Sequence, residues 1–173
     1  MKPSIIGNAL GKFFKEGESG MEKMKIMLVD DEERFLLTTS KLLVRKGFNV
    51  VTASSGEHCL EMLSREAVHV VILDVKMPGM DGLETLREIK QRHPLVEVIM
   101  LTGHATVESA VEGLKSGATD YLMKPISVDD LILMAEAAFA RRRVLEEKIR
   151  EAQTRRFMGQ SPRDIINDAE NKA

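Results

Sequence analysis

The stretch VHVVILDVKMPGMDG, residues 68–82, joins a run of β-branched apolar residues to an aspartate and then to a loop that contains proline and glycine. Four consecutive apolar residues, Val70 to Leu73, are typical of a strand that is buried on both faces of a parallel sheet. Ligands of such sheets bind beyond the carboxyl ends of the strands. The stretch therefore predicts a central parallel strand with Asp74 at its functional end.

The same pattern recurs along the chain, because apolar runs of strand length alternate with amphipathic stretches of helical periodicity. The predicted strands cover residues 25–29, 49–53, 68–74, 96–101 and 120–123. The predicted helices cover residues 33–46, 56–66, 83–92 and 106–116, with a fifth helix from Ser127 onward. Gly47 and Gly117 follow two of these helices, where a left-handed cap is common. Alternating strands and helices build a parallel sheet with helices on both faces, so we predict an α/β fold.

Length and composition agree with one globular domain. The chain has 173 residues, of which 43% are hydrophobic and 30% charged, and its net charge is −2. No apolar run approaches the roughly 20 residues that cross a bilayer, and the first residues lack the pattern of an export signal. Cys59 has no second cysteine to pair with and lies in an apolar helical pattern, so we expect a buried, reduced thiol. We therefore predict a cytoplasmic protein without a membrane partner.

Polar residues follow four of the five predicted strands. Asp30 and Asp31 follow the first strand, Asp74 ends the third, Thr102 follows the fourth and Lys124 follows the fifth. Each alone has an ordinary explanation, since acidic pairs often cap helices and lysines are usually solvated. Three carboxylates at one edge repel each other, however, unless a cation is present. Oxygen ligands with room for water and phosphate favour Mg²⁺.

A carboxylate beside such a cation can act as a nucleophile toward phosphorus and form an aspartyl phosphate. Lys124 and the metal would offset charge on the transferred group, and Thr102 could donate its hydroxyl to a phosphate oxygen. Two other classes of protein share parts of this pattern. An aspartate-dependent hydrolase would need a general acid and usually a closing cap, and no such insertion is visible. A purely structural dimerisation module would not need the complete acidic site.

Four motifs occur in the order of the predicted strands: LVDDE at residues 28–32, ILDVKMPGMDG at 72–82, LTGHA at 101–105 and DYLMKP at 120–125. With these motifs the chain resembles the receiver domain of two-component response regulators over residues 24–143. It is most similar to the receivers of AAA+ transcription activators of the nitrogen-regulation type. The resemblance implies a flavodoxin-like sheet with strand order 2-1-3-4-5 and an extended last helix. Residues 1–23 would then be a flexible extension, and residues 144–173 a continuation of the last helix and a flexible tail.

The resemblance also implies a function. A histidine kinase or a phosphotransfer protein would donate a phosphoryl group to Asp74, and the module would act as a signalling switch in a phosphorelay and not as an enzyme. Asp31 and Asp74 would bind Mg²⁺ directly, Asp30 would bind it through water, and the backbone carbonyl of Lys76 would be a further ligand. The side chains of Lys76 and His104 flank the phosphoryl site and would tune the lifetime of the phosphate.

In the family that the chain resembles, a threonine and an aromatic residue reorient after phosphorylation. Those positions are Thr102 and Tyr121, and their movement would change the face formed by the fourth helix, the fifth strand and the fifth helix. A downstream protein target would read this change by binding, since an added dianion can bias a surface between two states. The bond between Lys124 and Pro125 resembles the family's cis peptide, which aims the lysine at the phosphate.

The fifth predicted helix carries a stripe with alternating steps of three and four residues, the spacing of a coiled-coil seam. The stripe consists of Leu131, Ala135, Ala138, Arg142, Leu145, Ile149, Ala152 and Arg156, and its two arginines interrupt the seam. A second copy of the chain, bound through this helix or through the switching face, is therefore a further candidate partner. Residues 157–162, FMGQSP, are similar to the entrance of the ATPase domain in multidomain transcription activators. The basic run 141–143 lacks a second helix for a helix-turn-helix, so we do not expect nucleic acid as a partner.

Overall fold

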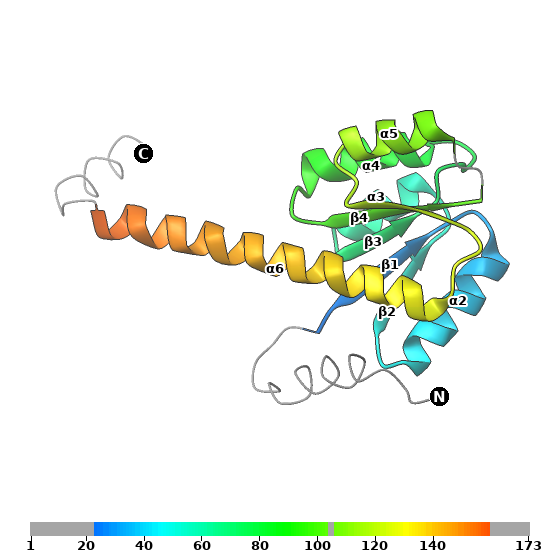
Figure 1. Ribbon diagram of the computed structural model, residues 1–173, viewed down its shortest axis with the longest axis horizontal. Coiled ribbons are helices and arrows are strands. Elements are labelled where there is room, and N and C mark those ends of the chain that lie inside the picture. The colour runs from blue at the N-terminus through cyan, green and yellow to red at the C-terminus, as the bar shows by residue number, and fades with distance from the viewer. Residues whose placement is uncertain (1–22, 104–105, 160–173) are drawn as a thin grey trace, which may run out of the picture.

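The computed structural model describes residues 23–103 and 106–159, in which five strands alternate with five helices (Figure 1). The strands are β1 (Lys25–Val29), β2 (Asn49–Ala53), β3 (Val70–Leu73), β4 (Glu97–Thr102) and β5 (Asp120–Met123). The helices are α2 (Glu33–Arg45), α3 (Gly56–Leu63), α4 (Gly82–Arg92), α5 (Val107–Lys115) and α6 (Val128–Gly159). All neighbouring strands pair in parallel, in the order β2-β1-β3-β4-β5. The predicted fold class and strand order are confirmed.

The strand boundaries follow from pairing with the neighbours. β1, β2 and β5 have the predicted bounds, whereas β3 is shorter than residues 68–74. Its register pairs Val70 with Ile26 and Leu73 with Val29, the last residue of β1. Asp74 lies just beyond this ladder, although its backbone N–H still donates to the carbonyl of Val29. The acidic side chain is thus held at the strand end by the sheet itself.

Both faces of the sheet are buried, because successive side chains of a strand point to opposite sides. In β1, Met27 and Val29 belong to a core cluster under α3 and α4, and Ile26 and Leu28 belong to a second cluster under α2 and α6. Figure 1 shows α3, α4 and α5 on one side of the sheet and α2 and α6 on the other. The continuous apolar runs of the sequence are explained by this three-layer arrangement.

Helix ends are fixed by short polar side chains and by glycine. Ser55 accepts the N–H of His58 at 3.1 Å at the start of α3, and Thr106 forms a capping box with Ser109 at the start of α5. Gly47 and Gly117 have φ angles of 92° and 99°, in the left-handed region that the cap after a helix requires. The sequence-based prediction for these two glycines is confirmed.

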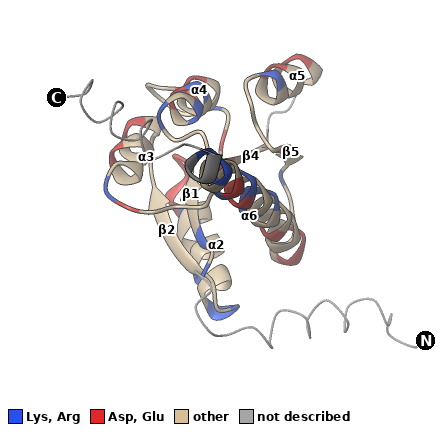
Figure 2. Ribbon diagram, turned by 90° about the vertical axis from the view of Figure 1, so that its left-hand side faces the viewer, with Lys and Arg blue, Asp and Glu red and all other residues tan. Residues whose placement is uncertain are grey.

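Helix α6 spans 32 residues, a length of about 48 Å at 1.5 Å per residue. Its first part packs on the sheet, where Leu131, Ala135 and Ala138 are at most 2% exposed. Beyond the sheet, Leu145 and Ile149 are 42% and 38% exposed. Figure 2, a view nearly along α6, shows acidic and basic residues on this helix. Within residues 23–103 and 106–159, none of the helices has the length and apolar character needed to span a bilayer.

This packing corrects one sequence-based interpretation. The stripe with coiled-coil spacing was predicted to run from Leu131 to Arg156 as one seam, but its first three residues are part of the domain core. A core-facing helical stripe and a coiled-coil seam share the same spacing, so periodicity alone does not separate them. Only the positions from Leu145 onward remain accessible to another molecule.

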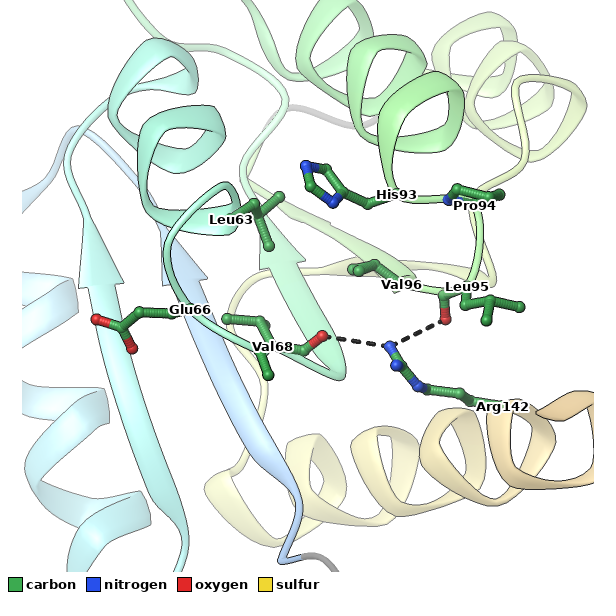
Figure 3. A pocket seen from close by; sticks show the side chains of 9 residues that line it. Leu63, Glu66, Val68, His93, Pro94, Leu95, Val96 and Arg142 are labelled. Atoms are coloured by element: carbon green, nitrogen blue, oxygen red, sulfur yellow. Dashed lines mark hydrogen bonds between the residues drawn. The ribbon is translucent and has the colours of Figure 1, made fainter. Parts of the chain in front are cut away.

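At the amino ends of the strands, Arg142 joins α6 to the segments that precede β3 and β4. Its Nη1 donates to the carbonyls of Val68 and Leu95, both at 3.2 Å (Figure 3). Its Nε donates to Glu146 at 2.8 Å. The guanidinium lies beside a pocket of about 290 Å³. Arg142, one of the two arginines in the predicted seam, is in the structure a residue that holds α6 at this edge.

Candidate functional site

The predicted acidic residues meet at the carboxyl edge of the sheet. Asp30 follows β1 and Asp74 follows β3, and these two strands are neighbours. Asp30 is 2% exposed and Asp74 is 9% exposed, whereas Asp31 is exposed to solvent. One carboxylate oxygen from each of the three residues lies within 4.8 Å of the others. The parallel topology thus brings side chains separated by more than 40 residues in sequence into one cluster.

Asp30 is held by two contacts. Its Oδ1 accepts the backbone N–H of Glu32 at 2.9 Å, and its Oδ2 pairs with the Nζ of Lys124 at 2.5 Å. The side chain of Lys124 is 20% exposed, and its Nζ lies 4.1 Å from the centroid of the Phe35 ring. The Lys124–Pro125 peptide bond is cis. Lys124 therefore reaches the acidic cluster from the end of β5, across the width of two strands.

Asp74 lies in an electrostatic environment that disfavours its charged form. Burial, followed by the nearby charge of Asp30, raises the pKa of its carboxyl group. Lys124, the backbone N–H of Val75 and the hydroxyl of Thr102 act in the opposite direction without cancelling the increase in pKa. The site accordingly holds more negative charge than its own protein partners neutralise.

The donor set fits a divalent cation. Three carboxylates face one ammonium group, so two negative charges remain uncompensated when all are ionised. All side-chain donors in the cluster are oxygens, which is the chemistry of Mg²⁺ and Ca²⁺ sites and not of a zinc site. The predicted backbone ligand, Lys76, lies two residues after Asp74 in the loop that follows β3, with an exposed side chain. His104, predicted beside the site, lies outside the described residues.

The loop after Asp74 is shaped by a glycine that the sequence-based reasoning did not single out. The N–H of Gly82 donates to the carbonyl of Val75 at 2.8 Å, and this brings the first turn of α4 against the backbone of Asp74. A Cβ atom at Gly82 would lie 2.0 Å from the carbonyl oxygen of Asp74, so a larger residue would displace the loop. Glycine at this position keeps the Asp74 backbone in place.

Thr102 and Tyr121, the two predicted switch residues, lie at different depths. Thr102 is fully buried at the end of β4, and its side chain acts to lower the pKa of the Asp74 carboxyl group. Tyr121 is half-buried on β5, and its hydroxyl lies 2.9 Å from Oγ of Ser109 on α5. The Tyr121 ring packs against Gly113, where an added Cβ would come within 3.3 Å. Tyr121 is thus tied to α5, and Thr102 to the acidic cluster.

Two contacts of the site were missed by the sequence-based reasoning. The Phe35 ring lies against Lys124, and the hydroxyl of Ser109 is hydrogen-bonded to the hydroxyl of Tyr121. Phe35 is five residues from Asp30 in the first turn of α2, and its role depends on tertiary packing that periodicity does not reveal. Ser109 had a local signal, because it completes the capping box of α5.

A doubly wound parallel sheet with a carboxylate cluster and a lysine at its carboxyl edge defines the receiver class of signalling modules. The family model described as response regulator receiver domain matches residues 26–136, and the chain belongs to this family. This agrees with the resemblance drawn from the four motifs.

The chain is similar to the receiver parts of transcriptional regulators and to solved receiver structures. It is 37% identical over 151 residues to the transcriptional regulatory protein ZraR of Klebsiella oxytoca. The matched segment covers 85% of this chain and 34% of that protein. It is 36% identical over 120 residues to the DNA-binding transcriptional regulator NtrC of Escherichia coli K12, covering 69% and 26%. The receiver domain of NtrX from Brucella abortus is similar with a TM-score of 0.63 and 37% identity, covering 66% and 98%. The chain spans about a third or less of the length of these curated relatives.

Proposed function

We propose that this chain is a phosphorylation switch in which Asp74 accepts a phosphoryl group from a histidine kinase or a phosphotransfer protein. One observation carries the proposal: Asp74 shares a cluster with buried Asp30 and exposed Asp31, and Lys124 approaches this cluster with its Nζ 2.5 Å from Asp30. The membership of the receiver family adds support. A carboxylate among other carboxylates is useful as an acceptor because the excess charge favours a cation beside it.

The transfer itself is a substitution at phosphorus. An oxygen of the Asp74 carboxylate forms the new O–P bond while the P–N bond of the donor phosphohistidine breaks. The electron pair of that bond returns to the imidazole nitrogen, which takes up a proton from water. Catalysis of such transfers consists mainly of positioning and of charge stabilisation.

Residues of this chain supply most of that positioning. Asp30, Asp31, Asp74 and the carbonyl of Lys76 would hold Mg²⁺, and the bound ion would supply positive charge to the phosphoryl oxygens. Lys124 contributes a second positive charge, with its Nζ 2.5 Å from Oδ2 of Asp30. The side chain of Thr102 already acts on the pKa of Asp74, and its hydroxyl donates to a phosphoryl oxygen after transfer.

The output is a change in protein contacts at the face formed by α5, β5 and α6. This face carries exposed apolar side chains, namely Val107 at 77%, Val111 at 43%, Leu114 at 50% and Met123 at 60% exposure. Inward movement of Thr102 and rotation of Tyr121 would alter this face, because the Tyr121 hydroxyl is hydrogen-bonded to Ser109 of α5. A downstream protein, or a second copy of the chain, binds this face or the exposed part of α6. In this proposal the switch operates in the cytoplasm, where it meets the histidine kinase or the phosphotransfer protein.

Phosphorylation by a small donor tests this function. Wild-type protein incubated with phosphoramidate and Mg²⁺ should gain one phosphoryl group that survives acid and is released by base. Asp74→Asn should gain none, because an amide cannot form the acyl phosphate. Asp81→Asn is the matched control, since it changes an aspartate of the same loop and keeps a side chain able to cap α4. Equal labelling of Asp74→Asn and the wild type would overturn the proposal.

A further inference from the structure

Phe35 contacts Lys124, and the proposed phosphoryl transfer assigns no role to this contact. Its ring, in the first turn of α2, faces the ammonium group of Lys124 with 4.1 Å between Nζ and the ring centroid. Lys124 follows β5 at the edge of the sheet, and α2 covers the face of the sheet next to α6. The contact therefore joins two segments that lie 89 positions apart in the chain.

The ammonium group of Lys124 is held from two sides. Oδ2 of Asp30 lies 2.5 Å from Nζ, and the face of the Phe35 ring lies on another side of it. The face of an aromatic ring carries partial negative charge and attracts a cation within about 6 Å of its centroid. Only 20% of the Lys124 side chain is exposed, so water screens this attraction incompletely.

Lysine needs such support because of its flexibility. Its ammonium is a compact charge at the end of a four-carbon stem, and ordering that stem costs conformational entropy. A lysine that is ordered before the donor arrives does not bear this cost during phosphoryl transfer. An aliphatic side chain in place of Phe35 would cover the stem but would lack the negative ring face.

We propose that Phe35 is a positioning residue for Lys124, whose ring keeps the ammonium group at the acidic cluster before the phosphoryl group arrives. The proposal rests on the proposed function, because it assigns Lys124 a part in the transfer. Phe35→Leu should lower the maximal rate of phosphorylation about 2- to 10-fold, the range expected for loss of one cation–π contact. Phe35→Tyr keeps the ring and should retain the wild-type rate within about 2-fold.

A spectroscopic measurement on the unphosphorylated protein tests the geometry directly. Protons above an aromatic face resonate upfield, so the ε-methylene protons of Lys124 should be shifted upfield in the wild type and in Phe35→Tyr. The shift should vanish in Phe35→Leu and persist in Phe48→Leu. Phe48 is the matched control, because it packs against the same core cluster from the turn after α2. An ordinary chemical shift for the wild-type Lys124 protons would overturn the proposal without any variant.

Phosphorylation kinetics with phosphoramidate then test the consequence. In this reaction the Asp74 oxygen bonds to phosphorus as the P–N bond breaks, and ammonia leaves. Phe35→Leu should lower the maximal rate more than it raises the half-saturating concentration of phosphoramidate, while Phe48→Leu should change neither by as much as 2-fold. If both leucine variants slow the reaction equally, Phe35 has no positioning role. If the wild type is not labelled at all, the proposed function fails instead, which keeps the two failures distinct.

Discussion

At the amino edge of the sheet the polar groups meet partners within the protein, whereas at the carboxyl edge three carboxylates share one lysine. His69 is buried at the amino edge, where its Nδ1 accepts the N–H of Lys25 at 2.9 Å and its ring packs on Phe139. Lys90 donates to the carbonyl of Val96 at 2.7 Å, and Thr119 donates to buried Glu97. The hydrogen bonds of these groups are thus provided within the protein, and the charge of Glu97 favours the charged form of Lys90.

The carboxyl edge satisfies its hydrogen bonds but not its charges. Among the described residues no buried side-chain nitrogen or oxygen lacks a hydrogen-bond partner, so the difference between the edges is electrostatic. Excess charge lowers stability, and natural proteins retain such strain where function requires it. The comparison teaches that one edge stabilises the fold and the other is arranged to bind a cation and to react. Each of the following predictions changes one edge and asks whether the other responds.

The largest expected effect is at the amino edge. Arg142→Met should lower the free energy of unfolding by about 2 kcal/mol, because it removes a charged donor from two carbonyls and leaves them without that partner. Urea denaturation measures this loss. Labelling by phosphoramidate should stay at the wild-type rate, since the guanidinium lies at the end of the sheet away from Asp74.

The control for this prediction is Arg150→Met on the exposed part of the same helix. The side chain of Arg150 is 71% exposed and pairs with Glu147 on the surface, so its replacement should cost less than about 1 kcal/mol. Equal losses for the two variants would show that Arg142 does not anchor α6. A slower phosphorylation of Arg142→Met would show that the edges are coupled.

Magnesium should act on the carboxyl edge alone. A ligand that binds only the folded state at ten times its dissociation constant raises the free energy of unfolding by about 1.4 kcal/mol. Wild type and Arg142→Met should gain this increment equally in thermal denaturation with Mg²⁺. Asp31→Asn should gain less, because it removes the exposed carboxylate of the cluster without disturbing buried groups. A full increment in Asp31→Asn would place the ion elsewhere.

The carboxyl edge of the sheet could be predicted from the sequence in more detail than the amino edge. The strands, the left-handed caps and the cluster at the carboxyl edge follow from local patterns, because strand ends of a parallel sheet converge. The order of the strands was implied by the resemblance to receiver domains. Val70 to Leu73 was recognisable as a central strand since both of its faces are buried. Asp30, Asp74 and Lys124 were predictable for the same reason, because each directly follows a strand, and Thr102 ends one.

What the sequence did not reveal depends on tertiary contacts. The stripe that begins at Leu131 matched a coiled-coil seam, yet its partner for three positions is the sheet of the same chain. Arg142 was interpreted as an interruption of that seam, whereas its guanidinium donates hydrogen bonds to two carbonyls that precede strands β3 and β4. Phe35 looked like one more apolar residue of α2. In each case the spacing along the chain was visible, but the identity of the neighbour was not.

The smallest expected effect is the pH dependence of stability that comes from Asp74. Its pKa in the folded chain is raised above the ordinary value of 3.8, so between these two values the folded state binds more protons than the unfolded state. Stability therefore falls as pH rises through that window, and the ionised carboxylate is destabilising at neutral pH. Asp74→Asn removes this contribution and should raise the free energy of unfolding at pH 7, in the presence of a chelator, by about 1 kcal/mol, the scale of one close charge repulsion that is screened as in water.

The difference between Asp74→Asn and the wild type isolates this one group, because all other titrations are common to both. The gain in stability should be absent below pH 3.8, where both states of the wild type are protonated, and should grow to its full size above the raised pKa. Denaturation by urea across this range, without Mg²⁺, measures it. Addition of Mg²⁺ should reduce the gain, since the ion stabilises the wild-type carboxylate. A gain that does not vary with pH would mean that packing, and not charge, distinguishes the two side chains at this edge.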